Sequence, residues 1–132
     1  MNSGAQQHYF SSEEGDLANI GSAVRDVNWN AFGLDFLAKS DRGVFSYDHL
    51  DRGTAVFFSL VPPPPEQGNF LDLGCGWGPM SLCMAKLAPA SKVWAVDVNP
   101  RARDLVLRNI NIAQLKNIHV ETPDNVPSDI QF

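Results

Sequence analysis

Hydrophobic and polar positions follow two different periods along this chain, and the period changes near residue 69. Between residues 23 and 46, apolar residues recur at about every second position, which is typical of strands that bury one face. The apolar positions of the first two runs are Val24, Val27 and Trp29, then Leu34, Phe36 and Ala38. Turns are expected at residues 30–33 and 40–43, with a third run at 44–46. This pattern predicts a small antiparallel β meander.

A short helix and a proline run follow the meander. Asp51 suits the N-cap of a helix, and the segment up to Val61 is largely apolar before four prolines at 62–65 stop the helix. Four prolines in a row favour a stiff extended connector. We therefore expect four parts: a polar tail at 1–19, the meander with its short helix at 20–61, a proline-rich connector at 62–68, and the main fold at 69–132.

From residue 69 the pattern predicts strands and helices in alternation. Residues 69–73, 93–98 and 118–121 are interpreted as strands, and the nearly continuous apolar run at 93–98 is typical of a parallel strand buried on both faces. The first helix begins near Pro79, and its face toward the sheet is expected to consist of Met80, Cys83, Met84, Leu87 and Ala88. The second begins at Pro100, with inward positions Ala102, Leu105, Val106, Asn109, Ile110 and Ala113.

This order of elements, β-α-β-α-β, predicts an α/β fold with right-handed crossovers and a parallel sheet. The three strands are expected in the spatial order 3-2-1, which is half of a doubly wound, Rossmann-like sheet. The chain has 132 residues, of which 44% are hydrophobic, so it can bury the core of one domain but is short for a complete enzyme of this type. We expect a truncated Rossmann-like fold preceded by the meander.

Charge, cysteine content and hydropathy exclude several classes of function. A net charge of −5 gives no general attraction to nucleic acid, so this segment is not expected to provide most of the contacts to an RNA substrate. Cys75 and Cys83 form no metal-ligand pattern, and no metal site is expected. No apolar run reaches the roughly 18 residues of a membrane span, and the first residues lack a secretory signal. We expect a cytoplasmic protein with no membrane contact.

Three glycines mark the candidate binding loop. Gly74, Gly76 and Gly78 alternate between the first strand and the first helix of the main fold, where such a loop lets its backbone approach a ligand closely. Asp97 ends the second strand, where a carboxylate can accept hydrogen bonds from both hydroxyls of a ribose. The combination predicts a cofactor that contains a nucleoside.

The residues around the loop favour one nucleoside cofactor over another. Dinucleotide sites need a glycine at the place that Pro79 occupies here, because that glycine allows close packing beneath a pyrophosphate. Asp72 places negative charge where a pyrophosphate would be repelled and an ammonium group attracted. The loop therefore favours S-adenosylmethionine over NAD.

Two stretches, FLDLGCGWGPM (70–80) and VWAVDVNPRARDLVLRNI (93–110), resemble the first two motifs of class I S-adenosylmethionine-dependent methyltransferases. With HYFS (8–11), GVFS (43–46) and LDRGT (50–54), the chain is similar to the small-methyltransferase-domain group, which contains the 16S ribosomal RNA guanine-N2 methyltransferases. The resemblance implies methyl transfer from S-adenosylmethionine to the exocyclic amine of a guanine. The implied partner is ribosomal RNA or the small ribosomal subunit.

The resemblance also implies roles for individual residues. The methionine part of the cofactor would be surrounded by Asp72, Gly74, Gly76 and Gly78, and Cys75 in the same loop would also contact the cofactor. Asp97 would bind the ribose, Val98 would lie near the adenine and Asp124 would meet its amino group. Phe45 and Thr54 would close over the cofactor. Other roles stay open: Asp72 as a cap of the following helix, Asp124 as a turn acid, Phe45 as a core aromatic, and Trp77 as either a lid on the loop or a cofactor contact.

The chain departs from the family in its catalytic motif. The family uses an Asn-Pro-Pro motif after a fourth strand, but the prolines after residue 100 are Pro123 and Pro127, in Thr-Pro-Asp and Val-Pro-Ser. We therefore assign no catalytic residue and expect an N-terminal part that binds cofactor with negligible turnover alone. Two alternatives stay open. One is a non-catalytic module that binds cofactor or pairs with another chain through the exposed edge of residues 70–73, and the other is a protein glutamine methyltransferase.

Overall fold

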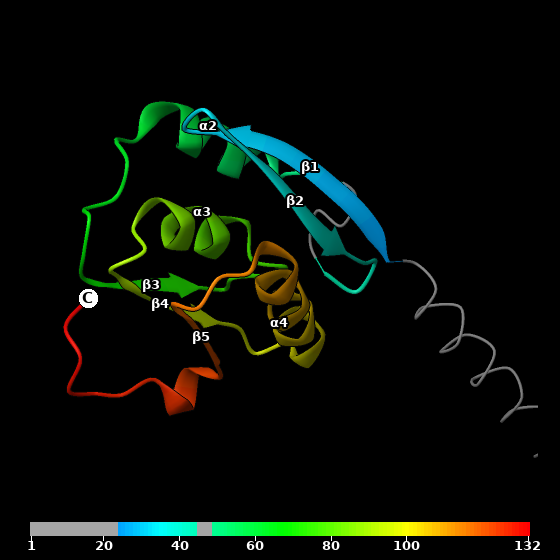
Figure 1. The fold of residues 1–132 in the computed structure, drawn as a ribbon. Helices are drawn as coiled ribbons and strands as arrows, with labels where there is room; N and C mark the ends of the chain where they lie inside the picture. The colour runs from blue at the N-terminus through cyan, green and yellow to red at the C-terminus, as the bar shows by residue number, and fades with distance from the viewer. Residues whose placement is uncertain (1–23, 45–48) are drawn as a thin grey trace, which may run out of the picture.

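The computed structural model describes residues 24–44 and 49–132. Two strands come first, β1 (Arg25–Ala31) and β2 (Leu34–Ser40), followed by helix α2 (Arg52–Leu60). The main fold then runs β3 (Asn69–Leu73), α3 (Pro79–Leu87), β4 (Lys92–Val96), α4 (Pro100–Ala113), β5 (Ile118–Glu121) and the 3-10 turn η1 (Pro123–Asn125). Figure 1 shows β1 and β2 as a ribbon that curves over one side of the main fold.

The N-terminal strands form a two-stranded antiparallel sheet in which Trp29 lies opposite Phe36. Phe32 and Gly33 connect them with φ angles of 53° and 74°, a two-residue turn whose twist matches that of the strands. The rings of Trp29 and Phe36 stack with centroids 5.0 Å apart, so the alternating apolar face predicted from the sequence is buried. Of the expected third run, Val44 lies in a bend, and Phe45 and Ser46 lie outside the described residues.

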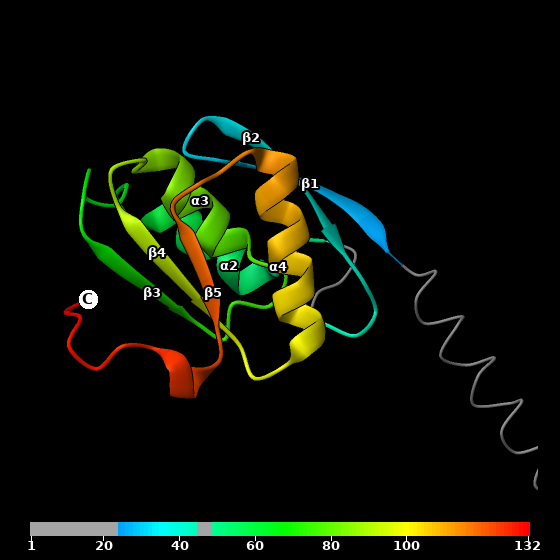
Figure 2. The same ribbon diagram turned by 60° about the horizontal axis from the view of Figure 1, so that its bottom comes forward.

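The three remaining strands form a parallel sheet with the order β3-β4-β5. Figures 1 and 2 show α3 and α4 on the same face of this sheet, with the β1-β2 hairpin and α2 on the outer side of these helices. The predictions of a three-stranded parallel sheet and of a separate antiparallel element are confirmed. Among the described residues, no helix is long and apolar enough to cross a membrane.

The buried face of α3 matches the predicted one only in part, because Cys83 and Ala88 are buried as expected but three other predicted residues are not. Its buried residues are Ser81, Leu82, Cys83 and Ala85. Met80, Met84 and Leu87, which we expected against the sheet, are half-buried and line an apolar groove beside α2 and the prolines at 62–65. The reason is that α3 lies between two layers: Ser81 bonds with Asp72 of β3, whereas Leu82 joins the core of the hairpin. The prediction for α4 holds better, because Ala102, Leu105, Val106 and Asn109 are all buried. Ile110 is half-buried, and Ala113, at the last turn of the helix, is exposed, contrary to the prediction.

Helix α2 begins where the sequence predicted. The Asp51 carboxylate accepts a hydrogen bond from the Thr54 backbone N–H at 3.1 Å and caps the first turn. The helix ends at Leu60, ahead of the prolines. Its one buried residue is Phe58, whose ring meets that of Phe32 at the hairpin turn with centroids 5.9 Å apart. This contact fixes α2 beside the tip of the hairpin.

Candidate cofactor site

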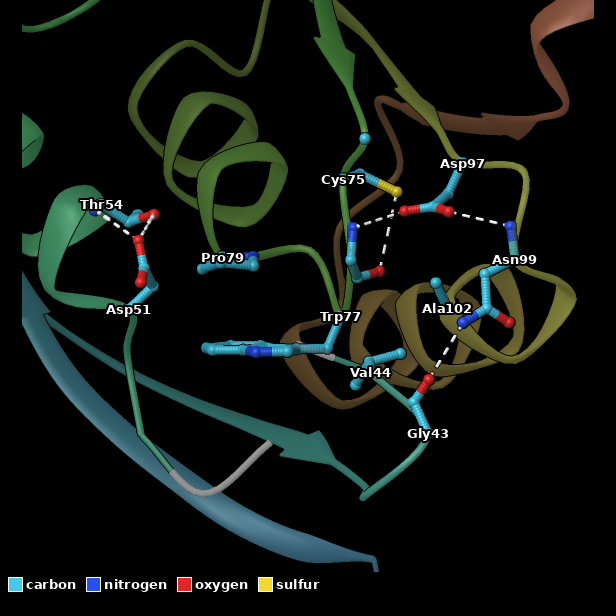
Figure 3. A pocket seen from close by; sticks show the side chains of 12 residues that line it. Gly43, Val44, Asp51, Thr54, Cys75, Trp77, Pro79, Asp97, Asn99 and Ala102 are labelled. Carbon is cyan, nitrogen blue, oxygen red and sulfur yellow. Dashed lines mark hydrogen bonds between the residues drawn. The ribbon is translucent and has the colours of Figure 1, made fainter. Parts of the chain in front are cut away.

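A cavity of about 310 Å³ lies at the carboxyl ends of β3 and β4, the edge of a parallel sheet where ligands bind in open α/β folds. Its described lining comes from the glycine loop, from the turn between β4 and α4, and from residues 43–44 and 51–54 (Figure 3). Its lining consists of Gly43, Val44, Asp51, Thr54, Gly74, Cys75, Gly76, Trp77, Pro79, Asp97, Asn99 and Ala102.

The glycine loop takes a conformation that side chains at its glycines would disturb. Gly76 has a φ of 58° and Gly78 a φ of 97°, both in the left-handed region that favours glycine. A Cβ at Gly78 would lie 3.1 Å from Cγ2 of Val106 in α4, so this glycine also permits the close approach of loop and helix. The backbone N–H groups of Gly74 and Cys75 both donate to the carbonyl of Val96, which fixes the loop to the end of β4.

Asp97 joins the two strand ends of the site. Its Oδ2 accepts a hydrogen bond from the Gly76 backbone N–H at 2.9 Å, and its Oδ1 accepts one from the Asn99 backbone N–H at 2.9 Å. Figure 3 shows the carboxylate between these two partners. Each carboxylate oxygen keeps a further lone pair, so the group can still accept hydrogen bonds from a ligand.

Asp72 lies behind the loop and does not line the cavity. It is 8% exposed, and its Oδ2 accepts hydrogen bonds from the hydroxyl and the backbone N–H of Ser81, at 2.6 and 3.1 Å. Burial raises the pKa of this carboxyl, the hydrogen bonds from Ser81 lower it, and the charge of Asp97 adds a further increase. Asp72 therefore holds the start of α3, which is the capping role that the sequence left open.

The other predicted residues fall into three groups. Gly74, Cys75, Gly76 and Thr54 line the cavity, as Asp97 does. Three more lie outside the lining: Gly78 is buried against α4, Val98 is 79% exposed on the turn after Asp97, and Asp124 is exposed in η1. Phe45 lies outside the described residues. Their roles toward a cofactor stay predictions.

The two thiols are poor nucleophiles. Cys75 and Cys83 are both free and buried. Burial raises the pKa of Cys83 to about 12, and burial together with the charges of Asp72 and Asp97 raises that of Cys75 further. Because the thiolate is the reactive form, neither sulfur is suited to covalent chemistry near neutral pH. In the described part of the chain, no three His, Cys, Asp or Glu side chains form a group that could hold a metal ion.

Sequence reasoning missed the contacts that fasten the segment after β2 to the start of α4. The Asn99 side chain donates from Nδ2 to the carbonyl of Gly43 at 3.0 Å and accepts from the Arg101 backbone N–H at 3.0 Å. Arg101 also packs over Gly43, where a Cβ would overlap its side chain, and pairs with Asp41 at 3.7 Å. The Asn-Pro pair signalled a helix start, but nothing in the sequence indicated a partner 56 residues away.

Comparison with known proteins places the site in a family context. The family model described as "Methyltransferase small domain" matches residues 35–131. A Bacillus subtilis protein, YbxB, is 29% identical over 118 residues, covering 89% of this chain and 57% of its own length. The "Ribosomal RNA large subunit methyltransferase G" of Pseudoalteromonas translucida is 33% identical over 86 residues, 65% of this chain and 22% of that protein. The chain thus spans little more than half of one relative and less than a quarter of the other.

Solved structures share the fold. The T. thermophilus 16S rRNA N2 G1207 methyltransferase (RsmC), solved with AdoMet and guanosine, matches with a TM-score of 0.61 and 22% identity over 83% of this chain and 29% of its own. The M. jannaschii TYW2, solved with AdoMet, matches with a TM-score of 0.58 and 22% identity over 76% of this chain and 44% of its own.

Proposed function

Because this chain belongs to the methyltransferase small domain family, we propose that it forms the cofactor-binding part of an S-adenosylmethionine-dependent methyltransferase acting on ribosomal RNA. The observation that carries the proposal is the bond at 2.9 Å between the Gly76 amide and Asp97, which joins the glycine loop and the acid of the next strand at one cavity. Two sequence motifs that a methyltransferase uses for one ligand thus meet in space.

The charge of the cavity fits S-adenosylmethionine better than a dinucleotide. Asp51 and Asp97 contribute two carboxylates to the lining, and none of the described lining residues is lysine or arginine. S-adenosylmethionine carries a sulfonium and an ammonium group, which an acidic cavity attracts, whereas the pyrophosphate of NAD would be repelled. Calorimetry of the whole chain with S-adenosylhomocysteine and with NAD tests this assignment. Tighter binding of NAD would overturn it.

When bound, S-adenosylmethionine supplies a methyl group that its sulfonium already activates, so the protein contributes mainly position. In this chain Asp97 would hold the ribose, the glycine loop would take the methionine part, and Thr54 would lie on the opposite wall. Val98 and Asp124 would meet the adenine. The Asn-Pro-Pro motif expected from the resemblance does not occur in the 132 residues. We therefore propose that the chain binds cofactor and does not transfer the methyl group by itself.

The proposed substrate is the exocyclic N2 of a guanine in 16S ribosomal RNA. It is supported by the fold shared with RsmC, whose structure contains guanosine. A hybrid in which this chain replaces the matched region of YbxB tests the substrate with tritiated S-adenosylmethionine, and YbxB itself, assayed in parallel, shows which label does not depend on this chain. Cofactor binding serves as the folding control. Label in 16S RNA supports the proposal, label in large-subunit RNA assigns the other subunit, and label in a release factor supports a glutamine methyltransferase.

A second candidate is a binding module without catalysis. Strand β3 is an edge of the sheet, and its Leu71 and Leu73 are 39% and 71% exposed. An unpaired edge with apolar side chains invites pairing with another strand, including one from a second copy of the chain. Light scattering measures the mass in solution, and a monomer at all concentrations would count against self-association. The cytoplasm remains the expected compartment under both functions.

A further inference from the structure

Asn109 of α4 is fully buried, and its side-chain amide makes three hydrogen bonds to the backbone of two distant segments. Its Nδ2 donates to the carbonyl of Lys39 at 2.9 Å and to the carbonyl of Trp77 at 2.8 Å. Its Oδ1 accepts from the Lys39 backbone N–H at 2.6 Å. Both amide hydrogens and one oxygen lone pair are thus used, which is nearly the full capacity of an asparagine.

The two segments that Asn109 joins both lead to the lining of the cavity. Trp77 lies inside the glycine loop, between Gly76 and Gly78, and lines the cavity. Lys39 lies at the end of β2, whose continuation supplies Gly43 and Val44 to the other wall. The bond to the Trp77 carbonyl fixes the orientation of the peptide between Trp77 and Gly78, and therefore the path of the loop. Asn109 itself does not line the cavity.

We propose that Asn109 is a positioning residue for cofactor binding, which sets the distance and orientation between the glycine loop and the hairpin wall. The inference rests on the proposed function, because it assigns the preorganisation of that same site to one buried amide. A bound ligand that touches both walls would gain from this rigidity, since the cost of ordering them has been met before binding. Without the amide, the folded chain would hold its cofactor more weakly.

Asn117, which is half-buried, provides a control within the same chain. Its Nδ2 also donates to two backbone carbonyls, those of Ala85 and Ala88, each at 3.1 Å. These carbonyls lie at the end of α3, away from the cavity. The same isosteric change, Asn→Asp, removes paired amide donors at both sites. A role limited to general stability predicts equal consequences for cofactor binding, whereas a positioning role predicts an effect at Asn109 alone.

The test measures S-adenosylhomocysteine binding by calorimetry for the whole chain, Asn109→Asp and Asn117→Asp, at a temperature where thermal melts show each to be folded. We expect Asn109→Asp to weaken affinity about tenfold or more, because two backbone carbonyls lose their donor, and Asn117→Asp to change it less than about twofold. Unchanged affinity in Asn109→Asp, or equal losses in both variants, would overturn the inference. Failure of the unmodified chain to bind would instead overturn the proposed function.

Hydrogen exchange on the unmodified chain decides the question if Asn109→Asp does not fold. The Lys39 N–H, which donates to Asn109, lies outside the cavity lining. The Ser91 N–H, bonded to the Ala88 carbonyl at 2.9 Å at the other end of the sheet, is the reference. We expect S-adenosylhomocysteine to slow exchange at Lys39 more than at Ser91. Equal slowing at the two amides would show that the walls are not coupled through Asn109.

Discussion

The backbone amide of Gly76 donates to the carboxylate of Asp97 across 21 residues of sequence, at 2.9 Å. The bond connects the loop after β3 to the turn after β4. The backbone N–H of Asn99 donates to the second oxygen of the same carboxylate. A ligand that binds Asp97 therefore also contacts the glycine loop, whose conformation depends on Asp97. Loss of this one carboxylate is expected to disturb both the binding of the ligand and the conformation of the loop.

Replacing Asp97 with asparagine tests that dependence. Both carboxylate oxygens accept from backbone N–H groups, so an amide NH₂ in place of either oxygen would face a donor. We expect S-adenosylhomocysteine affinity to fall by about tenfold or more. Calorimetry measures the change, and Asp104→Asn, on an exposed position of α4, is the control. Equal affinity in Asp97→Asn and the unmodified chain would contradict the assignment of Asp97.

Gly78→Ala is expected to destabilise the fold through two effects that can be separated. The backbone has a φ of 97°, and the added methyl group would lie 3.1 Å from Val106 Cγ2. Together these predict a loss of about 1 to 3 kcal/mol in the free energy of unfolding, measured in urea. Gly33→Ala is the control, because its φ is 74° but a Cβ there meets nothing within 4 Å. Equal losses at the two glycines would contradict the packing part of the prediction.

The buried Asp72 predicts a specific pH dependence of stability. Its pKa in the folded chain is raised above the ordinary 3.8, chiefly by burial, so the folded state favours the protonated form. The contribution to stability is therefore fully present below pH 3.8 and is lost as the pH rises through the folded pKa. We expect Asp72→Asn to remove this decline. Urea midpoints measured from about pH 4 to 7 give the comparison, and parallel curves for the two proteins would refute it.

Thiol labelling tests the place of Cys75 at the cavity. Both cysteines are buried, and their raised pKa values predict slow alkylation by iodoacetamide in the folded chain and fast alkylation in urea. Cys75 lines the cavity and Cys83 does not. We expect S-adenosylhomocysteine to slow labelling of Cys75 more than that of Cys83, as measured by mass spectrometry of the peptides. Greater protection of Cys83 would place the ligand elsewhere.

The sequence predicted the elements of this fold well because its periods are simple. The alternation of apolar and polar residues over 24–38 predicted the hairpin. The helical spacing of apolar residues over 102–109 predicted the buried face of α4. The family expected from the glycine and acid motifs is confirmed. The face of α3 was predicted only in part: Cys83 and Ala88 are buried as expected, but a helix between two layers buries more than one stripe. Periodicity alone does not show which neighbours a helix has.

The candidate site was predictable only in part. Asp97 and the glycines are local signals, since a strand end and a loop can be read from adjacent residues. The contacts of Asn99 with Gly43 and of Asn109 with Lys39 join residues 56 and 70 positions apart, and depend on how the hairpin lies on α4. Asp72 shows the same limit. Its carboxylate accepts hydrogen bonds from Ser81, nine positions further along the chain, and does not line the cavity.

The described lining of the cavity comes from residues 43–44, 51–54, 74–79 and 97–102, so it is drawn from separate stretches of the chain. The cofactor is therefore expected to bind the folded chain and not the unfolded chain. Binding then shifts the folding equilibrium toward the native state. At a ligand concentration about 100 times the dissociation constant, this linkage contributes about 2.7 kcal/mol to stability. Under the proposed function, the abundance of intact protein would follow the supply of its cofactor.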